Sequence, residues 1–371
     1  MHEEFMRVAL ELAQKGKGRV NPNPLVGAII VKDGRIIGKG YHEKYGENHA
    51  EINAFESAIE DTSGATMYVT LEPCSHYGKT PPCADKIIEK NISKVVIGTL
   101  DPNPLVSGKG VNKLRDAGIE VITGILEEEC LKINEIFMKY IKEKKPFVLL
   151  KSAMSLDGKI ATSIGESKWI TGEEARAQVH KLRNEYSAIM VGVDTVIKDN
   201  PQLNCRLKDG RNPIKIIVDS KLRISMESNI VKNARKEPVI LATTTEANEE
   251  KINALKDKEV RVLVVDSENG KVNLKKLVGK LGELKIDGIL LEGGATLAFS
   301  AIESGIVDKV NVYIAPKLIG GQGAKTPLGG NGIERLKDAF EIRNMDVRFV
   351  GEDILIEGYL KGGHSDVHGD S

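Results

Sequence analysis

The sequence predicts an α/β protein with two domains. Short apolar segments typical of strands alternate with helical patterns along almost the whole chain, which indicates layered sheets and helices. At 371 residues the chain is also too long for one hydrophobic core. A charged run that ends in proline, residues 142–146, interrupts the pattern. We therefore expect domains at 1–145 and 146–361. A polar tail follows at 362–371, and its composition predicts disorder rather than metal binding by its two histidines.

The first half begins with a helical pattern. Phe5, Val8 and Leu12 recur at helical spacing and predict an amphipathic helix over residues 3–15. The elements expected after it are strands at 26–31 and 35–40 joined by an Asp-Gly turn, a helix at 51–59, a strand at 67–71, a helix at 83–90, a strand at 95–100, a helix at 109–117, a strand at 120–123 and a helix at 127–141.

The second half repeats this alternation without any internal sequence repeat. Its expected strands are 147–151, 187–193, 214–219, 238–243, 260–265, 288–292 and 309–314, with an edge strand within 349–360. Its expected helices are 173–184, 247–256, 273–284 and 295–304. Buried strands that alternate with helices indicate a second α/β unit.

Charge and composition exclude several classes of partner. Lys plus Arg and Asp plus Glu both number 53, so the chain lacks the basic surplus needed to coat nucleic acid or an anionic membrane. The N-terminus does not resemble a signal peptide, and no window approaches the roughly 18 apolar residues of a membrane span. We expect a cytoplasmic protein, in which the four cysteines are more suited to metal binding than to disulfides.

Three residues of the first half predict a zinc site. His49, Cys74 and Cys83 supply the three ligands of a catalytic zinc, which leaves a fourth position for water. Glu51 lies two residues after His49, and in a regular helix such positions point in different directions. Both side chains face one metal only if His49 lies at the irregular start of a helix. His-x-Glu followed by Pro-Cys and a later Cys is typical of zinc deaminases.

The charges of these groups assign a role to Glu51. Two thiolates and a neutral imidazole cancel the charge of zinc, so the bound water is acidified less than in an all-histidine site. A nearby carboxylate must then take the proton and return it to the substrate, which makes Glu51 the proton shuttle. The alternatives are a closed structural site with His76 as a fourth ligand, or core cysteines without metal.

The spacing of the cysteines departs from that of a nucleobase deaminase. The familiar pattern is Cys-x-x-Cys, whereas eight residues separate Cys74 from Cys83. The inserted residues 75–82 are polar and basic, which suits contacts to a polar or phosphorylated substrate.

These features resemble the bifunctional riboflavin biosynthesis family, which joins a diaminohydroxyphosphoribosylaminopyrimidine deaminase to an aminophosphoribosylaminouracil reductase. The eight-residue gap is what this family shows. The likeness runs from residue 1 to about residue 361. The stretches that carry it are 21–27 (Asn-Pro-Asn-Pro-Leu-Val-Gly), 46–51 (Gly-Glu-Asn-His-Ala-Glu), 70–83 from Thr-Leu-Glu-Pro-Cys to the second Cys, 101–104 (Asp-Pro-Asn-Pro), 151–159 from Lys-Ser-Ala-Met to Asp-Gly-Lys, 165–171 (Gly-Glu-Ser-Lys-Trp-Ile-Thr) and 291–294 (Leu-Glu-Gly-Gly).

The resemblance implies a cytidine-deaminase-like α/β/α domain followed by a dihydrofolate-reductase-like α/β domain. It implies zinc on His49, Cys74 and Cys83, with Glu51 as shuttle. It places six further residues around the pyrimidine and ribose phosphate: Asn23, His42, His76, Lys79, Asp101 and Asn103. Two alternatives stay open here, a surface position for His42 and a plain turn at residues 101–104.

The second domain needs a site for a hydride donor. No Gly-x-Gly-x-x-Gly follows a strand, so a Rossmann site is not supported. Instead, the strand ending at Glu292 runs through Gly293 and Gly294 into a helix, an arrangement that offers backbone N–H groups to a phosphate. A glycine pair alone is a weak signal, and the resemblance makes it the expected pyrophosphate cradle for NADPH.

By position within the family motifs, two further sets of residues belong to the reductase site. The expected cofactor contacts are Ala153, Trp169, Thr195, Asp199, Ser220, Gly294, Ala295 and Thr296. The expected substrate contacts are Ser167, Arg183, Leu203, Arg206 and Glu292. Arg183 and Arg206 suit a phosphate clamp, and Lys151 is a candidate to orient or protonate the reacting oxygen. Trp169 is either a core residue or a flat wall beside the ligands, and Arg223 is a candidate cation for NADPH preference.

The sequence thus predicts two consecutive reactions. Zinc hydroxide deaminates 2,5-diamino-6-(ribosylamino)pyrimidinone 5'-phosphate, and NADPH then reduces the ribosyl group to ribityl, giving 5-amino-6-ribitylaminouracil 5'-phosphate. We expect one Zn²⁺ per deaminase domain, a small phosphorylated substrate and a homo-oligomer, without nucleic acid or membrane partners. The alternatives are a nucleic-acid or free-nucleobase deaminase with an unrelated second domain, and a zinc-stabilised binding module.

Overall fold

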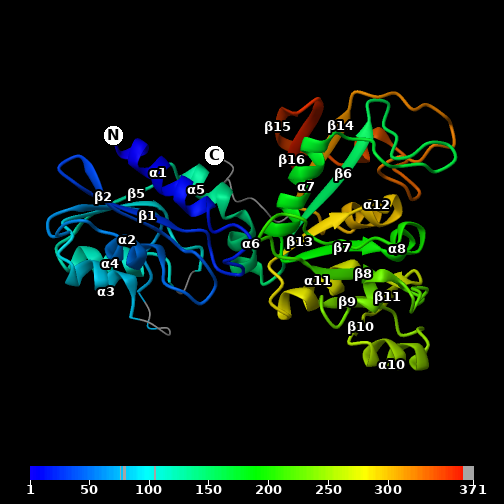
Figure 1. Cartoon of the computed structure of the whole chain (residues 1–371), viewed down its shortest axis with the longest axis horizontal. Coiled ribbons are helices and arrows are strands. Elements are labelled where there is room, and N and C mark those ends of the chain that lie inside the picture. Colours follow the sequence, from blue (N-terminus) through cyan, green and yellow to red (C-terminus); the bar gives the residue numbers. More distant parts are fainter. Residues whose placement is uncertain (76, 78–80, 104–105, 362–371) are drawn as a thin grey trace. The chain divides into compact units, whose positions relative to one another are not determined.

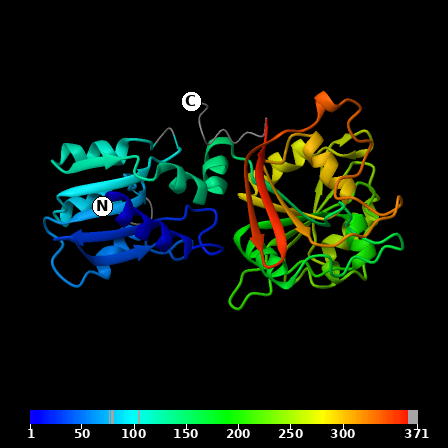
Figure 2. The same ribbon diagram turned by 90° about the horizontal axis from the view of Figure 1, so that it is seen from above.

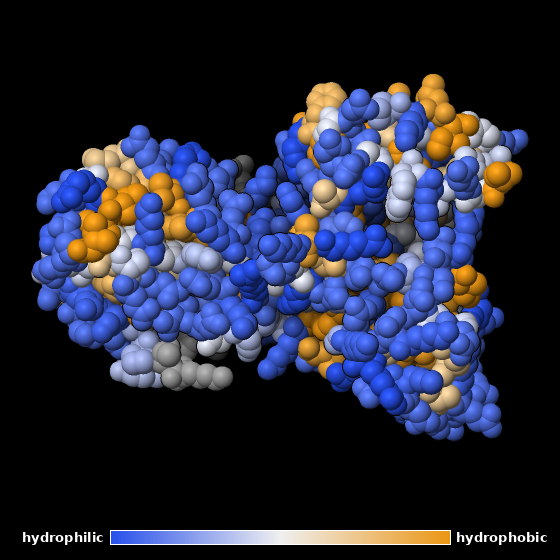
Figure 3. Space-filling view, in the orientation of Figure 1, coloured by the Kyte–Doolittle hydropathy of each residue, from blue (hydrophilic) through white to orange (hydrophobic). Residues whose placement is uncertain are grey.

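The computed structural model describes residues 1–75, 77, 81–103 and 106–361. Its contacts divide the chain into two compact units (Figure 1). One unit comprises Met1–Glu143, and the other begins at Lys144. In the described part of the chain, no helix has both the length and the apolar character needed to cross a membrane. The face shown in Figure 3 is mostly hydrophilic, with separate apolar patches on each unit.

The first unit is built on a five-stranded sheet with the strand order β2-β1-β3-β4-β5. β1 pairs with β2 and β3 in antiparallel fashion, whereas β3, β4 and β5 are parallel. The turn between β1 and β2 holds Asp33 at φ 48° and Gly34 at φ 74°, the geometry that this Asp-Gly pair favours. The strands are β1 (Gly27–Lys32), β2 (Arg35–Tyr41), β3 (Thr66–Leu71), β4 (Lys94–Thr99) and β5 (Glu120–Thr123).

Helices cover both faces of this sheet. Helices α1 and α5 pack on one face, against residues such as Ile29 and Val96. Helices α2, α3 and α4 pack on the other, against residues such as Ile30 and Ile97. The alternation along each strand therefore supplies two apolar cores, and the unit has three layers. The helices are α1 (His2–Gln14), α2 (Ala50–Glu56), α3 (Cys83–Glu89), α4 (Lys109–Asp116), α5 (Glu127–Ile133) and α6 (Glu135–Glu143).

The single helix expected at 127–141 is wrong, because two helices meet at Asn134. The side chain of Asn134 accepts a hydrogen bond from Leu25 N at 2.8 Å and donates one to Leu25 O at 2.9 Å. This side-chain amide thus satisfies the backbone N–H and C=O groups of Leu25, far away in the sequence, at the point where a continuous helix would otherwise run. The helical periodicity of the segment carries no information about that partner.

The second unit is built on a nine-stranded sheet with the order β10-β9-β8-β7-β13-β6-β14-β16-β15. The strands from β10 to β14 are parallel, and β16 and β15 add an antiparallel edge hairpin, red in Figure 2. The strand expected within 349–360 is β16, and the outermost strand β15, which lies almost wholly before that range, was not expected. The strands are β6 (Phe147–Ser155), β7 (Ala188–Gly192), β8 (Ile214–Val218), β9 (Val239–Thr243), β10 (Arg261–Val264), β13 (Gly288–Glu292), β14 (Lys309–Ala315), β15 (Ile342–Val350) and β16 (Asp353–Leu360).

Helices again cover both faces. α11 and α12 pack on one face, and α7, α8, α9 and α10 pack on the other. A small separate hairpin, β11 (Ser267–Glu268) with β12 (Lys271–Val272), precedes α11. This hairpin, α8, α9 and the short η1 (Leu336–Asp338) were not expected from the sequence. The helices are α7 (Glu173–Glu185), α8 (Val193–Asp199), α9 (Asn229–Lys232), α10 (Glu249–Asp257), α11 (Leu274–Glu283) and α12 (Ala295–Glu303).

Candidate active sites

His49 occupies the position expected for a metal ligand that shares its helix start with an acid. It is the N-cap of α2, with extended backbone angles of φ −73° and ψ 163°, and the helix begins at Ala50. Side chains two positions apart in a regular helix point in different directions. Because His49 lies outside the regular helix, its ring and the Glu51 side chain can face the same point. The prediction that His49 lies at the helix start is confirmed.

His49, Cys74 and Cys83 bring their ligand atoms together. These atoms all lie within 4.8 Å of one another. His49 Nδ1 lies 3.6 Å from Cys74 Sγ and 3.3 Å from Cys83 Sγ. A tetrahedral zinc with its usual bond lengths would separate nitrogen and sulfur by roughly 3.6 Å. The three side chains therefore fit a zinc ion bound through Nδ1 and two thiolates.

The electrostatics of the cluster favour a cation. Hydrogen bonding to Cys83 lowers the pKa of the Cys74 thiol to about 4, against the opposing effect of burial. The pKa of Cys83 is raised, because its proton is held by the neighbouring Cys74 sulfur and burial opposes a second thiolate. Cys74 also raises the pKa of His49 to about 9. Cys74 is therefore a thiolate near neutral pH, and a divalent cation can displace the protons held by Cys83 and His49.

Glu51 is enclosed beside this cluster. Its side chain is only 3% exposed, and burial raises its pKa to about 7, with a further contribution from Cys74. A carboxyl group poised near neutrality can take and return a proton at working pH. The position and the chemistry of Glu51 both suit a proton shuttle.

The other deaminase residues form two groups. His42 is buried, so the alternative of a surface position is wrong. Its Nδ1 lies 3.0 Å from Asn48 O and its Nε2 lies 3.1 Å from Asn23 Nδ2. His42 therefore connects Asn23 to the segment just before His49. Burial lowers the pKa of His42, which favours the neutral ring that this pairing requires.

The second group follows β4. Asn103 N donates to Asp101 Oδ1 at 2.8 Å, so the two candidate residues share one local turn. His76 and Lys79, the remaining candidates of this domain, lie outside the described residues.

Two adjoining cavities lie in the second unit, with volumes of about 520 Å³ and 1030 Å³. They share seven lining residues, among them Thr195, Asp199 and Gly294. All of the reductase residues named from the sequence line one or both cavities. The smaller is lined by Lys151, Ala153, Trp169, Arg183, Leu203, Arg206 and Glu292, and the larger by Ser220 and Thr296, with Ser167, Thr195, Asp199, Gly294 and Ala295 in both.

A buried cluster of charges lies in the wall of the smaller cavity. Arg183 Nε and Nη2 donate to the two carboxylate oxygens of Glu292 at 2.9 and 2.8 Å. Burial would raise the pKa of Glu292, but Arg183 and Lys151 lower it overall. Burial lowers the pKa of Lys151, and Glu292 opposes that shift. Glu292 is therefore an ionised carboxylate that stabilises two neighbouring cations.

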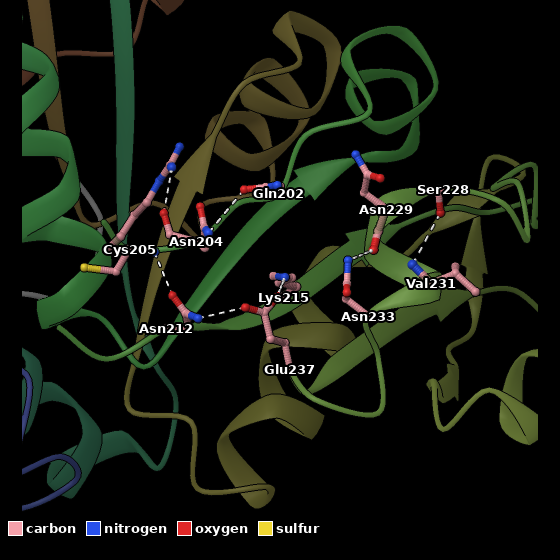
Figure 4. Close-up of polar contacts among 11 residues, drawn as sticks. Gln202, Asn204, Cys205, Asn212, Lys215, Ser228, Asn229, Val231, Asn233 and Glu237 are labelled. Atoms are coloured by element: carbon pink, nitrogen blue, oxygen red, sulfur yellow. Dashed lines mark hydrogen bonds and ion pairs between the residues drawn. The ribbon is translucent and has the colours of Figure 1, made fainter. Parts of the chain in front are cut away.

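The loop that carries Leu203 and Arg206 is fixed by amide groups (Figure 4). Cys205 N donates to Asn212 Oδ1 at 2.8 Å, and Asn212 Nδ2 donates to Glu237 Oε1 at 2.8 Å. Glu237 in turn pairs with the buried Lys215 of β8. Arg183 Nη1 donates to Asn204 O at 3.1 Å and holds the same loop from the side of α7.

The glycine pair lines both cavities, and the tryptophan lines the smaller one. Gly293 and Gly294 have φ angles of 71° and 81°, which other residues rarely adopt, and Gly294 is the N-cap of α12. The side chain of Trp169 is 63% exposed, so the alternative of a core residue is wrong. The Arg176 guanidinium lies 4.9 Å from the centre of its ring.

Other lining residues were missed by sequence reasoning. Tyr313 lies in the smaller cavity and is aligned with Ala153 in the parallel pairing of β14 with β6. The only sequence signal for Tyr313 was the alternation of side chains along its strand, which places it on the same face of the sheet as Ala153. Lys221 and Lys271 line the larger cavity, and the Asn269-Gly270 pair, a typical hairpin turn, was the signal for the hairpin that presents Lys271. The candidate Arg223 also lines this cavity, but it pairs with Asp194 at 2.7 Å.

Comparison with known proteins separates the two halves in the same way. Residues 1–99 match the family model of the cytidine and deoxycytidylate deaminase zinc-binding region, and residues 146–356 match that of the RibD C-terminal domain. The riboflavin biosynthesis protein RibD of Actinobacillus pleuropneumoniae is 53% identical over 354 residues, which cover 95% of this chain and 94% of that protein. The chain belongs to the RibD family.

Solved structures of RibD proteins resemble it over almost their full length. RibD of Acinetobacter baumannii has a TM-score of 0.86 at 38% identity, over 97% of this chain and 99% of that one. A diaminohydroxyphosphoribosylaminopyrimidine deaminase/5-amino-6-(5-phosphoribosylamino)uracil reductase of Thermotoga maritima has a TM-score of 0.83 at 44% identity, with the same coverage. The predicted fold class, a cytidine-deaminase-like domain followed by a dihydrofolate-reductase-like RibD domain, is confirmed.

The zinc triad generates a direct prediction. Cys83→Ser removes one thiolate, and we expect bound zinc to fall from about one ion per chain to below roughly 0.1 after dialysis against a weak chelator, because three-ligand sites depend on every ligand. Elemental analysis of the purified chain measures this. Cys205→Ser, a matched change in the second unit, should leave zinc unchanged. Equal zinc in the two variants would exclude the site.

Proposed function

We propose that this RibD protein catalyses two consecutive steps of riboflavin biosynthesis. The first domain hydrolyses the amino group of 2,5-diamino-6-(ribosylamino)pyrimidinone 5'-phosphate. The second reduces the ribosyl group of the product with NADPH to give 5-amino-6-ribitylaminouracil 5'-phosphate. The observation that carries this proposal is the occurrence in one chain of a His49-Cys74-Cys83 cluster beside Glu51 and of a Lys151–Glu292 cavity beside a glycine cradle.

In the deaminase, bound zinc would polarise the water that attacks the ring carbon. Glu51 takes a proton from this water and passes it to the ring nitrogen, and it then carries the hydroxyl proton to the amino group, which departs as ammonia while a carbonyl forms. Its burial keeps the carboxyl group able to carry the proton in both directions. Asn23, Asp101 and Asn103 are proposed to hold the pyrimidine and ribose, with His42 supporting Asn23. His76 and Lys79 complete the set by the family motif.

In the reductase, NADPH supplies the hydride that goes to C1' of the ribosyl group. The bond from C1' to the ring oxygen breaks, and that oxygen takes up a proton. Lys151 is the proposed donor, because its ammonium lies in the cavity and Glu292 stabilises its protonated form. Ser167, Leu203 and Arg206 are proposed to hold the substrate, and Arg183 to hold Glu292 together with the loop at Asn204.

The larger cavity suits the cofactor. Gly294, Ala295 and Thr296 offer the start of α12 to the pyrophosphate. Ala153, Trp169, Thr195 and Asp199 line the region proposed for the nicotinamide half, and Ser220 the adenosine half. Lys221 and Lys271 supply cations at the proposed adenosine end, which favours NADPH over NADH.

An exposed edge supports a homo-oligomer. β15 is the last strand of the large sheet and has one unpaired side. Its alternate residues Met345, Val347 and Phe349 are exposed apolar side chains, with Phe349 77% exposed. Such an edge is a template for pairing with another chain unless it is covered. We propose that a second copy covers β15.

A cytoplasmic location also stays a prediction.

The assay of both steps tests the proposed function. Wild-type enzyme with the diaminopyrimidine ribotide should release ammonia, and it should oxidise NADPH only after deamination. Glu51→Gln should reduce ammonia release by at least roughly 10³-fold, because the shuttle is lost, while zinc content and reduction of the deaminated substrate stay unchanged. Failure of the wild type to release ammonia would refute the first step. A parallel loss of reductase activity in the variant would contradict independent sites.

The single tryptophan allows cofactor preference to be measured without turnover. Trp169 lines the cavity and is exposed, so bound NADPH should quench its emission. We expect NADPH to bind at least roughly tenfold more tightly than NADH, and Lys271→Ala to reduce that ratio about threefold to tenfold, since one cation is lost. Lys275→Ala is the control, an exposed lysine at the start of α11. An unchanged ratio in Lys271→Ala would exclude this role.

Light scattering tests the proposed self-association. The wild-type chain, 40.5 kDa by sequence, should elute at twice this mass or more. The double variant Val347→Lys and Phe349→Lys places charges on the exposed edge and should shift the species to the monomer. The matched change Ile59→Lys, at an exposed apolar residue of the first unit, should not. A wild-type monomer at micromolar concentration would contradict the proposal.

A further inference from the structure

A buried carboxylate next to the zinc ligands has no role in the chemistry described so far. Glu72 follows β3, and its side chain is 5% exposed. It accepts four backbone hydrogen bonds. Oε2 accepts from Asp101 N at 3.2 Å and Gly108 N at 2.9 Å, and Oε1 accepts from Gly110 N at 2.9 Å and Val111 N at 3.2 Å.

These bonds fix both ends of one loop. Asp101 lies two residues after the end of β4 and Gly108 directly precedes α4, and both donate to the same oxygen. Between them, Val106 N and Ser107 N each donate to Asn103 O at 2.8 Å. The described residues of the loop therefore form one ordered turn, which carries the candidate substrate residues and is attached to Glu72 at its base.

The surroundings of Glu72 are closely packed and offer its carboxylate backbone N–H groups in place of a basic side chain. Among the described residues no basic side chain pairs with Glu72, so the backbone N–H groups and the positive end of α4 offset the cost of burying its charge. A side chain at Gly110 would bring Cβ within 2.2 Å of Pro73 O. The start of α4 thus lies directly against the segment that leads to Cys74.

We propose that Glu72 is a positioning residue of the deaminase, which fixes Asp101 and the start of α4 relative to Cys74. The zinc ligand and the loop then hold a constant separation, so that a substrate bound by Asp101 and Asn103 presents its ring carbon to the metal. This inference rests on the proposed function, since that function assigns the loop to the substrate. Glu72 itself contacts neither zinc nor the reacting atoms.

Glu72→Gln tests the clamp with almost unchanged shape. The amide has one acceptor oxygen, and its NH2 group faces two N–H donors whichever way it is turned. One pair of hydrogen bonds is lost, so amide exchange at Asp101 and Gly108, or at Gly110 and Val111, should accelerate by roughly tenfold or more. The KM for the ribotide should rise roughly tenfold while kcat changes less than about threefold. Zinc content and reductase activity should stay at wild-type values.

The control is Glu120→Gln, at an exposed glutamate of β5 that pairs with Lys94, and it should change none of these quantities. If Glu72→Gln does not accumulate as folded protein, Glu72→Asp keeps the charge but shortens its reach, and the same signature should appear. Unchanged exchange at all four amides, loss of kcat at unchanged KM, or loss of zinc would overturn the proposal. If the wild type releases no ammonia, the proposed function fails, and the exchange experiment still decides whether Glu72 holds the loop.

Discussion

Both candidate sites depend on one constraint, that the chain turns from a buried parallel strand into a helix at the edge where neighbouring strands end. In the first unit, β3 leads through Glu72 to Cys74, and β4 leads to Asp101. In the second, β13 leads through Gly293 and Gly294 into α12. Residues at such turns lie outside the regular repeats, so their side chains and N–H groups are available for ligands. The sheet interiors are apolar, and the chemistry is therefore confined to these edges.

The buried carboxylate at each of these sheet edges is balanced by groups in its immediate surroundings. Glu292 has Arg183 on one side and Lys151 nearby, and the three together avoid an unpaired buried charge. Glu72 has no such partner among the described residues and relies on four N–H groups. The difference matters for what each carboxylate can do. Glu292 lines a cavity and can act on a neighbouring ammonium, whereas Glu72 is enclosed by backbone and can only hold geometry.

The sequence predicted most strands and helices, because periodicity is a local property and both sheets are regular. It also predicted the helix start at His49, since a metal and a shuttle acid two residues apart demanded it. The sequence-based prediction failed where the position of a residue depends on a contact with a residue far away in the sequence. The break at Asn134 depends on Leu25, which lies 109 residues away. The pairing of Arg183 with Glu292 spans the same separation, and no local pattern reveals either contact.

That pairing also changes how the phosphate of the reductase substrate is expected to bind. A guanidinium has five N–H groups. In Arg183 three of them are engaged, two by Glu292 and one by Asn204 O. One bidentate face of Arg183, formed by Nε and Nη2, is therefore committed to Glu292, which also balances its charge. Arg206, on the loop fixed by Asn212 and Glu237, carries the cation with no such counter-charge in its own loop contacts. We therefore propose Arg206, rather than a clamp of two equal arginines, as the principal phosphate contact, with Arg183 holding the loop that carries Arg206.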